Sequence, residues 1–139
     1  MQDAVWWLKS VEELDAEAMR QAAQLLLGEH DFKSFCKAAS AEGISTMRRL
    51  EQLDVARIEE AGEELIAFDV GANAFLHNMV RVLVGTLVEV GRGAHEPAWV
   101  LKVLEARDRR AAGQSAPAEG LVLCHVEYPP GALRAWDER

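Results

Sequence analysis

The residue in this sequence that could most clearly take part in binding or catalysis is one arginine within an apolar helical pattern. Apolar residues recur at helical spacing from Leu76 to Val90, and Arg81 lies at the margin of their stripe, four residues after His77. A guanidinium at such a margin is partly desolvated and therefore requires an anionic partner, either a carboxylate or a phosphate. Two interpretations follow: a structural salt bridge within the domain, or an anion-binding site with a function.

The other polar candidates indicate phosphate contacts and no metal chemistry. Arg92 lies between two glycines, and Arg109 and Arg110 are adjacent in a stretch of small residues. These basic side chains either reach phosphates or remain ordinary solvated charges. The four histidines are scattered, and His95 and His125 look incidental. The two cysteines lack the close spacing of a zinc site. We therefore expect buried thiols and no metal site.

The elements that must position these residues follow from hydrophobic periodicity and from turn signals. Asp15 precedes an amphipathic helix that Gly28 ends, and Asp31 can cap a short second helix over residues 32–36. Residues 47–58 fit a helix about as well as a strand. A β-hairpin between this segment and residues 65–70 would account for both patterns. The remaining expected elements are a strand at 4–8 near the domain edge, helices over 76–90 and from Pro97 to Leu104, a loop at 108–120 and a buried strand at 121–126.

This order of strands and helices predicts an α+β fold, in which an antiparallel sheet carries helices on one face. The length of 139 residues fits one domain, which we place at residues 1–130, followed by a tail at 131–139. Trp6 and Trp7 point to opposite faces of their strand, so one is core and the other meets a neighbouring layer or another chain.

Charge and hydropathy limit the function further. The net charge of −8 argues against a protein that binds polyanions through its bulk field. Residues 1–70 hold 15 acidic and 7 basic residues, whereas residues 71–139 hold 8 of each, so a nucleic acid should contact the second half. The longest uncharged apolar stretch, 82–88, is far shorter than the roughly 20 residues of a membrane helix. No signal peptide is visible at the N-terminus, and we expect a cytoplasmic protein without membrane contact.

Four blocks of the sequence identify a family. Residues 75–81 with 84–91 strongly resemble the C-terminal half of the bacterial tRNA pseudouridine synthase A family, and the same is true of 26–35, 106–113 and 116–121. The resemblance implies half of a pseudouridine synthase fold, in an enzyme that isomerises uridines 38 to 40 of the tRNA anticodon stem-loop. It also implies a homodimer that uses no metal or organic cofactor.

The resemblance also implies a missing part. The family's catalytic aspartate lies in a Gly-Arg-Thr-Asp motif in the N-terminal half, and these 139 residues contain no such motif. None of the four aspartates weighed for the role, Asp31, Asp54, Asp69 and Asp108, inherits it from its context. We expect an active-site cleft completed by an absent N-terminal catalytic domain, and a chain that is inactive alone.

By the same resemblance, Arg81 matches the active-site arginine that pairs with the catalytic aspartate and favours its ionised form. Leu121 or Leu123 matches the apolar residue that packs beside the target base. We expect strand parity to decide between them, and we favour Leu121 because it follows Gly120.

His77 matches a position facing the cleft, where contact with RNA and plain surface exposure are both open. Asn78 departs from an expected histidine, and Val82 departs from a more polar residue. The alternative function is a non-catalytic RNA-binding or dimerisation module derived from the same fold.

Overall fold

A computed structural model of the chain describes residues 2–9 and 13–115 and the backbone of residues 121–127. The strands are β1 (Gln2–Leu8), β2 (Gly28–Asp31), β3 (Met47–Glu60), β4 (Glu63–Ala72) and β5 (Leu121–Glu127). The helices are α1 (Ala16–Leu26), α2 (Met79–Gly91) and α3 (Trp99–Ala106), with 3₁₀ turns η1 (Lys33–Phe35), η2 (Ala38–Ala41) and η3 (Arg109–Ala111).

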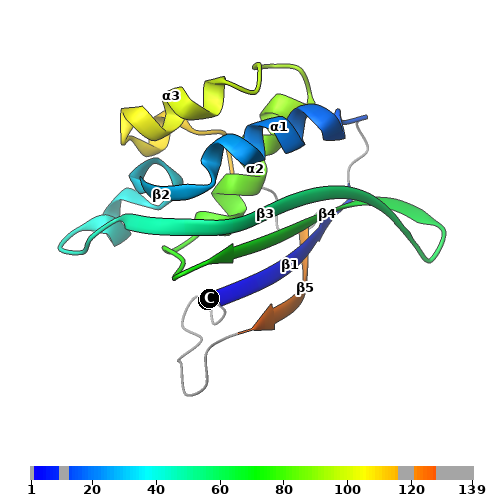
Figure 1. Ribbon diagram of the computed structural model, residues 1–139, viewed down its shortest axis with the longest axis horizontal. Helices are drawn as coiled ribbons and strands as arrows, with labels where there is room; N and C mark the ends of the chain where they lie inside the picture. The colour runs from blue at the N-terminus through cyan, green and yellow to red at the C-terminus, as the bar shows by residue number, and fades with distance from the viewer. Residues whose placement is uncertain (1, 10–12, 116–120, 128–139) are drawn as a thin grey trace.

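The five described strands form one sheet in the order β2-β3-β4-β1-β5, and every neighbouring pair is antiparallel. The three helices lie together on one face of this sheet (Figure 1). The predicted α+β architecture is therefore confirmed. The first strand, β1, is the second strand from one edge of the sheet, because it pairs with β4 on one side and with the distant β5, the edge strand, on the other.

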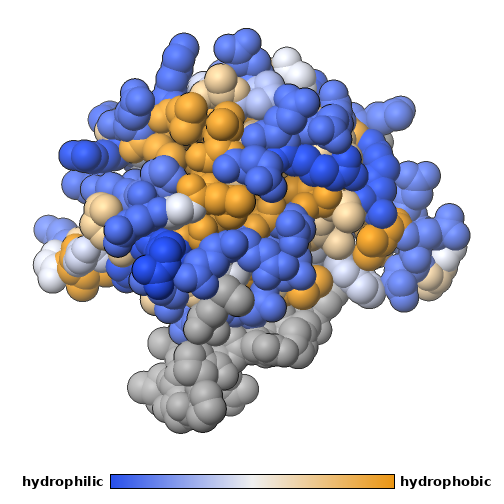
Figure 2. Space-filling model, viewed as in Figure 1, coloured by the Kyte–Doolittle hydropathy of each residue, from blue (hydrophilic) through white to orange (hydrophobic). Residues whose placement is uncertain are grey.

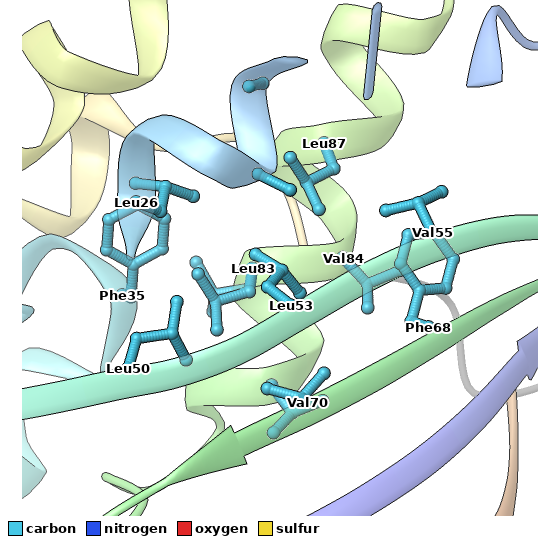
Figure 3. Packing of buried hydrophobic residues seen from close by; sticks show 14 of the residues in the cluster. Leu26, Phe35, Leu50, Leu53, Val55, Phe68, Val70, Leu83, Val84 and Leu87 are labelled. Carbon is cyan, nitrogen blue, oxygen red and sulfur yellow. The ribbon is translucent and has the colours of Figure 1, made fainter. Parts of the chain in front are cut away.

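The core lies between the sheet and the helices (Figure 3). Alternate residues of β4 face it, and Phe68 and Val70 are fully buried, as are Leu83 and Leu87 on α2. In β1, Trp6 is only 6% exposed whereas its neighbour Trp7 is half-buried, which confirms that the two indoles point to opposite faces. Figure 2 shows apolar residues in the middle of the view and hydrophilic residues around them.

One element differs from the sequence-based expectation, and the ambiguity of a second is resolved in favour of the hairpin; in both cases long-range pairing adds to or outweighs the local pattern. Residues 28–31 form β2 against the start of β3, so the segment expected as a second helix is reduced to the single turn η1. Asp31 is the last residue of β2 and not the cap of that turn, whose N-cap residue is Phe32, although Asp31 Oδ1 accepts a hydrogen bond from the Lys33 amide at 3.0 Å. The ambiguous segment 47–58 belongs to the long hairpin β3–β4.

Residues 76–78 precede α2 instead of opening it. The Met79 amide donates to the Leu76 carbonyl at 3.0 Å in a tight turn, and Asn78 adopts a left-handed backbone with φ of 64°. A left-handed residue cannot belong to a right-handed helix, so the helix begins at Met79. Within the described residues, no helix is long and apolar enough to span a membrane.

Asp15 caps α1 as the sequence predicts. Its side chain accepts a hydrogen bond from the Ala18 amide at 3.0 Å, and its own amide donates to the Gly91 carbonyl at 2.9 Å. We expect Asp15→Ala to lower the free energy of unfolding by about 1 kcal/mol, because it leaves an amide of the first turn without its acceptor. Urea denaturation measures the change. Asp15→Asn keeps the acceptor and should lose much less; equal losses in the two variants would contradict the capping role.

Candidate functional site

The loop between β4 and α2 carries the strongest candidate residues and is held by hydrogen bonds to two strands. The Asn73 amide donates to the Arg49 carbonyl at 3.1 Å, and the Asn73 side-chain oxygen accepts from the Arg49 amide at 2.8 Å. The Phe75 amide donates to Gln2 Oε1 at 3.2 Å. These bonds fix residues 73–78 to the start of β3 and to β1, and so fix where α2 begins.

Asn78 shapes the entry into α2. Its carbonyl accepts the first hydrogen bond of the α-helical type, from the amide of Val82 four residues later, at 3.0 Å. Asparagine is one of the few residues besides glycine that is enriched in the left-handed region. The side chain that departs from the family expectation is thus compatible with the backbone it occupies here, and the buried Val82 belongs to the core face of the helix.

Arg81 lies in the first turn of α2, between the buried Val80 and Val82, and is itself half-buried. This burial pattern places it at the edge of the apolar face, as the periodicity predicts. His77 is exposed on the preceding loop, only four residues away. The fold therefore presents both residues at the same end of α2.

Leu121 and Leu123 belong to β5, whose backbone pairs them with Leu8 and Trp6 of β1. Their side chains lie outside the described residues. Strand parity does not decide between them, contrary to our expectation, because positions two residues apart in a strand have the same parity. The Cys124 side chain is likewise outside the described residues, whereas Cys36 is buried and burial raises the pKa of its thiol.

The three loop arginines do not act as one group. Arg92 and Arg110 line the same pocket, of about 420 Å³, between the end of α2 and the start of α3. Arg109 instead donates to Ser115 Oγ at 3.4 Å. Arg110 lies 2.9 Å from the Asp108 carboxylate, and hydrogen bonds from its side chain lower the pKa of that carboxyl.

The pocket also contains His95, which looks incidental from the sequence, and Trp99, which is no candidate there. His95 stacks on Trp99 with ring centroids 3.8 Å apart and an interplanar angle of 8°. The four-residue spacing of these rings, just after Arg92 at the end of a helix, is the signal that sequence reasoning could have used. The described residues hold no group of three or more histidine, cysteine or acidic side chains able to bind a metal ion.

The segment that carries Arg110 is attached to α2 by a buried polar contact. The Gly113 amide donates to Thr86 Oγ1 at 3.1 Å, and both residues are buried. Ser34 makes a second such link, because its hydroxyl donates to the Val103 carbonyl at 2.6 Å and accepts from the Asp108 amide at 2.9 Å. These bonds set the position of residues 108–114 relative to the helices.

Comparison with known proteins assigns the chain to a family. The tRNA pseudouridine synthase family model matches residues 22–129, which is most of the sequence, and the chain therefore belongs to the tRNA pseudouridine synthase family. It is 50% identical over 117 residues to tRNA pseudouridine synthase A of Bordetella petrii, with 84% of this chain and 42% of that protein covered. It is 47% identical over 126 residues to tRNA pseudouridine synthase A of Aliivibrio salmonicida, with 91% and 45% covered. The Vibrio campbellii protein of the same name is 47% identical over 117 residues, with 84% and 42% covered. The chain thus spans less than half the length of these curated relatives.

Proposed function

We propose that the chain is the C-terminal domain of a tRNA pseudouridine synthase that converts uridines 38 to 40 of the anticodon stem-loop to pseudouridine. The observation that carries the proposal is the family match over residues 22–129, combined with coverage of only 42–45% of the relatives. Residues 1–130 form the domain and residues 131–139 a tail. The cleft is completed by an N-terminal catalytic domain, and the complete protein is a cytoplasmic homodimer.

The chemistry divides between the two parts. The N-terminal domain supplies an aspartate that attacks the ribose or assists cleavage of the glycosidic carbon–nitrogen bond. The released uracil turns, and its C5 bonds to C1′ of the ribose in place of N1, while C5 loses its proton and N1 gains one. Arg81 supplies the guanidinium that pairs with this aspartate and keeps it ionised and oriented. No metal or organic cofactor takes part.

The other candidate residues contact RNA. Leu121 or Leu123 provides an apolar surface beside the target base. Basic side chains approach the nucleic acid from loops and position its phosphates; these are His77, Arg92, Arg109 and Arg110.

A second candidate function is a non-catalytic RNA-binding or dimerisation module. It is supported by one observation, the absence of a Gly-Arg-Thr-Asp motif from the 139 residues. The two candidates differ in what happens when the N-terminal domain is supplied, because only a catalytic half can then complete an active site.

We expect the 139-residue chain alone to form no pseudouridine, since positioning groups cannot replace a missing nucleophile. Unmodified tRNA incubated with the purified chain and then mapped chemically for pseudouridine measures this. The matched sample is the same chain joined to the N-terminal part of its Bordetella petrii relative, which should be active.

Pseudouridine above background with the chain alone would overturn the proposed division of roles. A joined protein that folds and binds tRNA without modifying it would favour the non-catalytic module.

A further inference from the structure

The pocket between α2 and α3 combines an aromatic stack with two guanidinium groups. It is lined by residues 111–114 and by Glu89, Arg92, His95, Trp99 and Arg110. The lining residues come from three segments: the end of α2 with the residue that follows it, the turn before α3 with the first residue of α3, and η3 with the residues after it. Nothing in the chemistry proposed for Arg81 uses the histidine or the tryptophan.

The aromatic pair has the geometry of a stacking platform. His95 and Trp99 are parallel and in contact, with His95 exposed and Trp99 half-buried. Packing of the indole holds the inner ring in place, and the exposed imidazole is accessible to a further ring. Single-stranded nucleic acids bind in this way, because any base can stack on a flat aromatic side chain.

The guanidiniums lie where the phosphate of such a nucleotide would need a partner. Arg92 is 3.1 Å from the Glu89 carboxylate, and Arg110 is 2.9 Å from that of Asp108, and all four side chains are at least partly exposed. Exposed ion pairs of this kind contribute little, and a guanidinium has five N–H donors, more than one carboxylate uses. Because each arginine is paired with one carboxylate, the four charges cancel, and the site is close to neutral in a chain of net charge −8.

The pocket is also placed for a substrate that reaches Arg81. Arg92 follows Arg81 by eleven residues, which is about three helical turns. The two positions therefore lie on the same side of the helix axis, about 16 Å apart along it. An RNA stem-loop engaged at one end of α2 can extend over that distance. A phosphate and base near Arg92 would then belong to a nucleotide outside the one that reacts.

We propose that this pocket binds one unpaired nucleotide of the substrate RNA, with its base on the His95–Trp99 stack and its phosphate between Arg92 and Arg110. This inference rests on the proposed function, which supplies the class of ligand, RNA. It assigns a binding role to His95 and Trp99, and it separates Arg92 and Arg110 from Arg109, which makes a different contact.

The test is fluorescence anisotropy with a labelled, unmodified anticodon stem-loop RNA and the 139-residue chain, over a series of salt concentrations. His95→Ala should weaken binding about fivefold or more through lost stacking. The double variant Arg92→Gln/Arg110→Gln should weaken it about tenfold at low salt and reduce the salt slope by about one, as for loss of one phosphate contact. Lys102→Gln removes an exposed charge of α3 outside the pocket and should change binding less than twofold.

Circular dichroism and thermal unfolding confirm that each variant is folded, and His95 is exposed, so its removal leaves the core intact. Absence of RNA binding by the parent chain, or pocket variants that bind like the parent, would overturn the inference. Losses as large for Lys102→Gln as for the arginine variant would overturn it too, because they would indicate only a general charge effect.

The same variants in the chain joined to an N-terminal domain separate this inference from the proposed function. Pocket variants should raise KM about tenfold with kcat unchanged, because the pocket contacts RNA away from the reacting nucleotide. If pseudouridine forms and neither Kd nor KM responds, the pocket inference is wrong and the proposed function stands. If no pseudouridine forms but the variants still lose RNA binding, the pocket stands and the proposed function fails.

Discussion

Arg81→Ala, in the chain joined to the N-terminal part of its Bordetella petrii relative, is expected to lower the turnover of tRNA by about a hundredfold or more. The reason is that the catalytic aspartate loses the guanidinium that keeps it ionised and oriented, an effect comparable to removing one preorganised electrostatic group. Arg81→Lys keeps the charge but loses the planar fork, so it should retain only part of the activity. Single-turnover formation of pseudouridine measures both.

Stability distinguishes this account from a structural salt bridge. Arg81 is half-buried at the edge of the apolar face of α2, so its truncation creates no sealed cavity and should lower the thermal unfolding temperature by only a few degrees. Lys102→Ala, an exposed cation on α3, is the control and should affect neither quantity. An Arg81→Ala protein that unfolds, or that modifies tRNA at the parental rate, would show that the arginine serves the fold and not the reaction.

Gly113→Ala is expected to cause the largest loss of stability from a single methyl group. A Cβ atom at Gly113 would lie 2.9 Å from the carbonyl oxygen of Gly85 and 3.0 Å from Cα of Thr86, and both atoms belong to the backbone of α2. The clash can be relieved only by moving the helix or by breaking the hydrogen bond from Gly113 to Thr86. We expect the free energy of unfolding to fall by about 2–3 kcal/mol, the upper part of the range for overpacking.

Gly91→Ala is the matched control for that variant. Its Cβ would lie equally close, 2.9 Å, to a neighbouring atom, but that atom is Sδ of Met19, in a flexible side chain that can move. Urea denaturation should therefore show a loss of about 1 kcal/mol or less for Gly91→Ala. Equal losses for the two glycines would mean that residues 108–114 are not held against α2 as the structure places them.

Much of the fold can be predicted from local pattern, because its helices and its central hairpin have local signals. The Asp15 cap, the helical stripe of α2 and the glycine turn between β3 and β4 are all visible in the sequence. The pairing of β1 with β5 and the strand β2 are not, because they depend on contacts between residues far apart in the chain. A four-residue strand has too short a pattern to outweigh the signals of its neighbours.

The candidate site also has one part that the sequence predicts and one part that depends on contacts between distant residues. Periodicity alone predicts Arg81 at the edge of an apolar face, and the structure confirms that placement. The shared pocket of Arg92 and Arg110 has no comparable signal, and the His95–Trp99 stack has only the four-residue spacing of its rings. The pocket exists because Thr86 and Ser34 hold residues 108–114 against the helices, through hydrogen bonds that span 27 to 74 positions of sequence.

The central claim is that this chain supplies the arginine half of an active site that modifies the anticodon stem-loop. The most direct test is nucleotide-resolved mapping of pseudouridine in a full-length unmodified tRNA after incubation with the joined protein and with its Arg81→Ala variant. The account predicts pseudouridine at uridines 38 to 40 with the joined protein and almost none with the variant. Modification confined to other positions, or equal modification by both proteins, would contradict it.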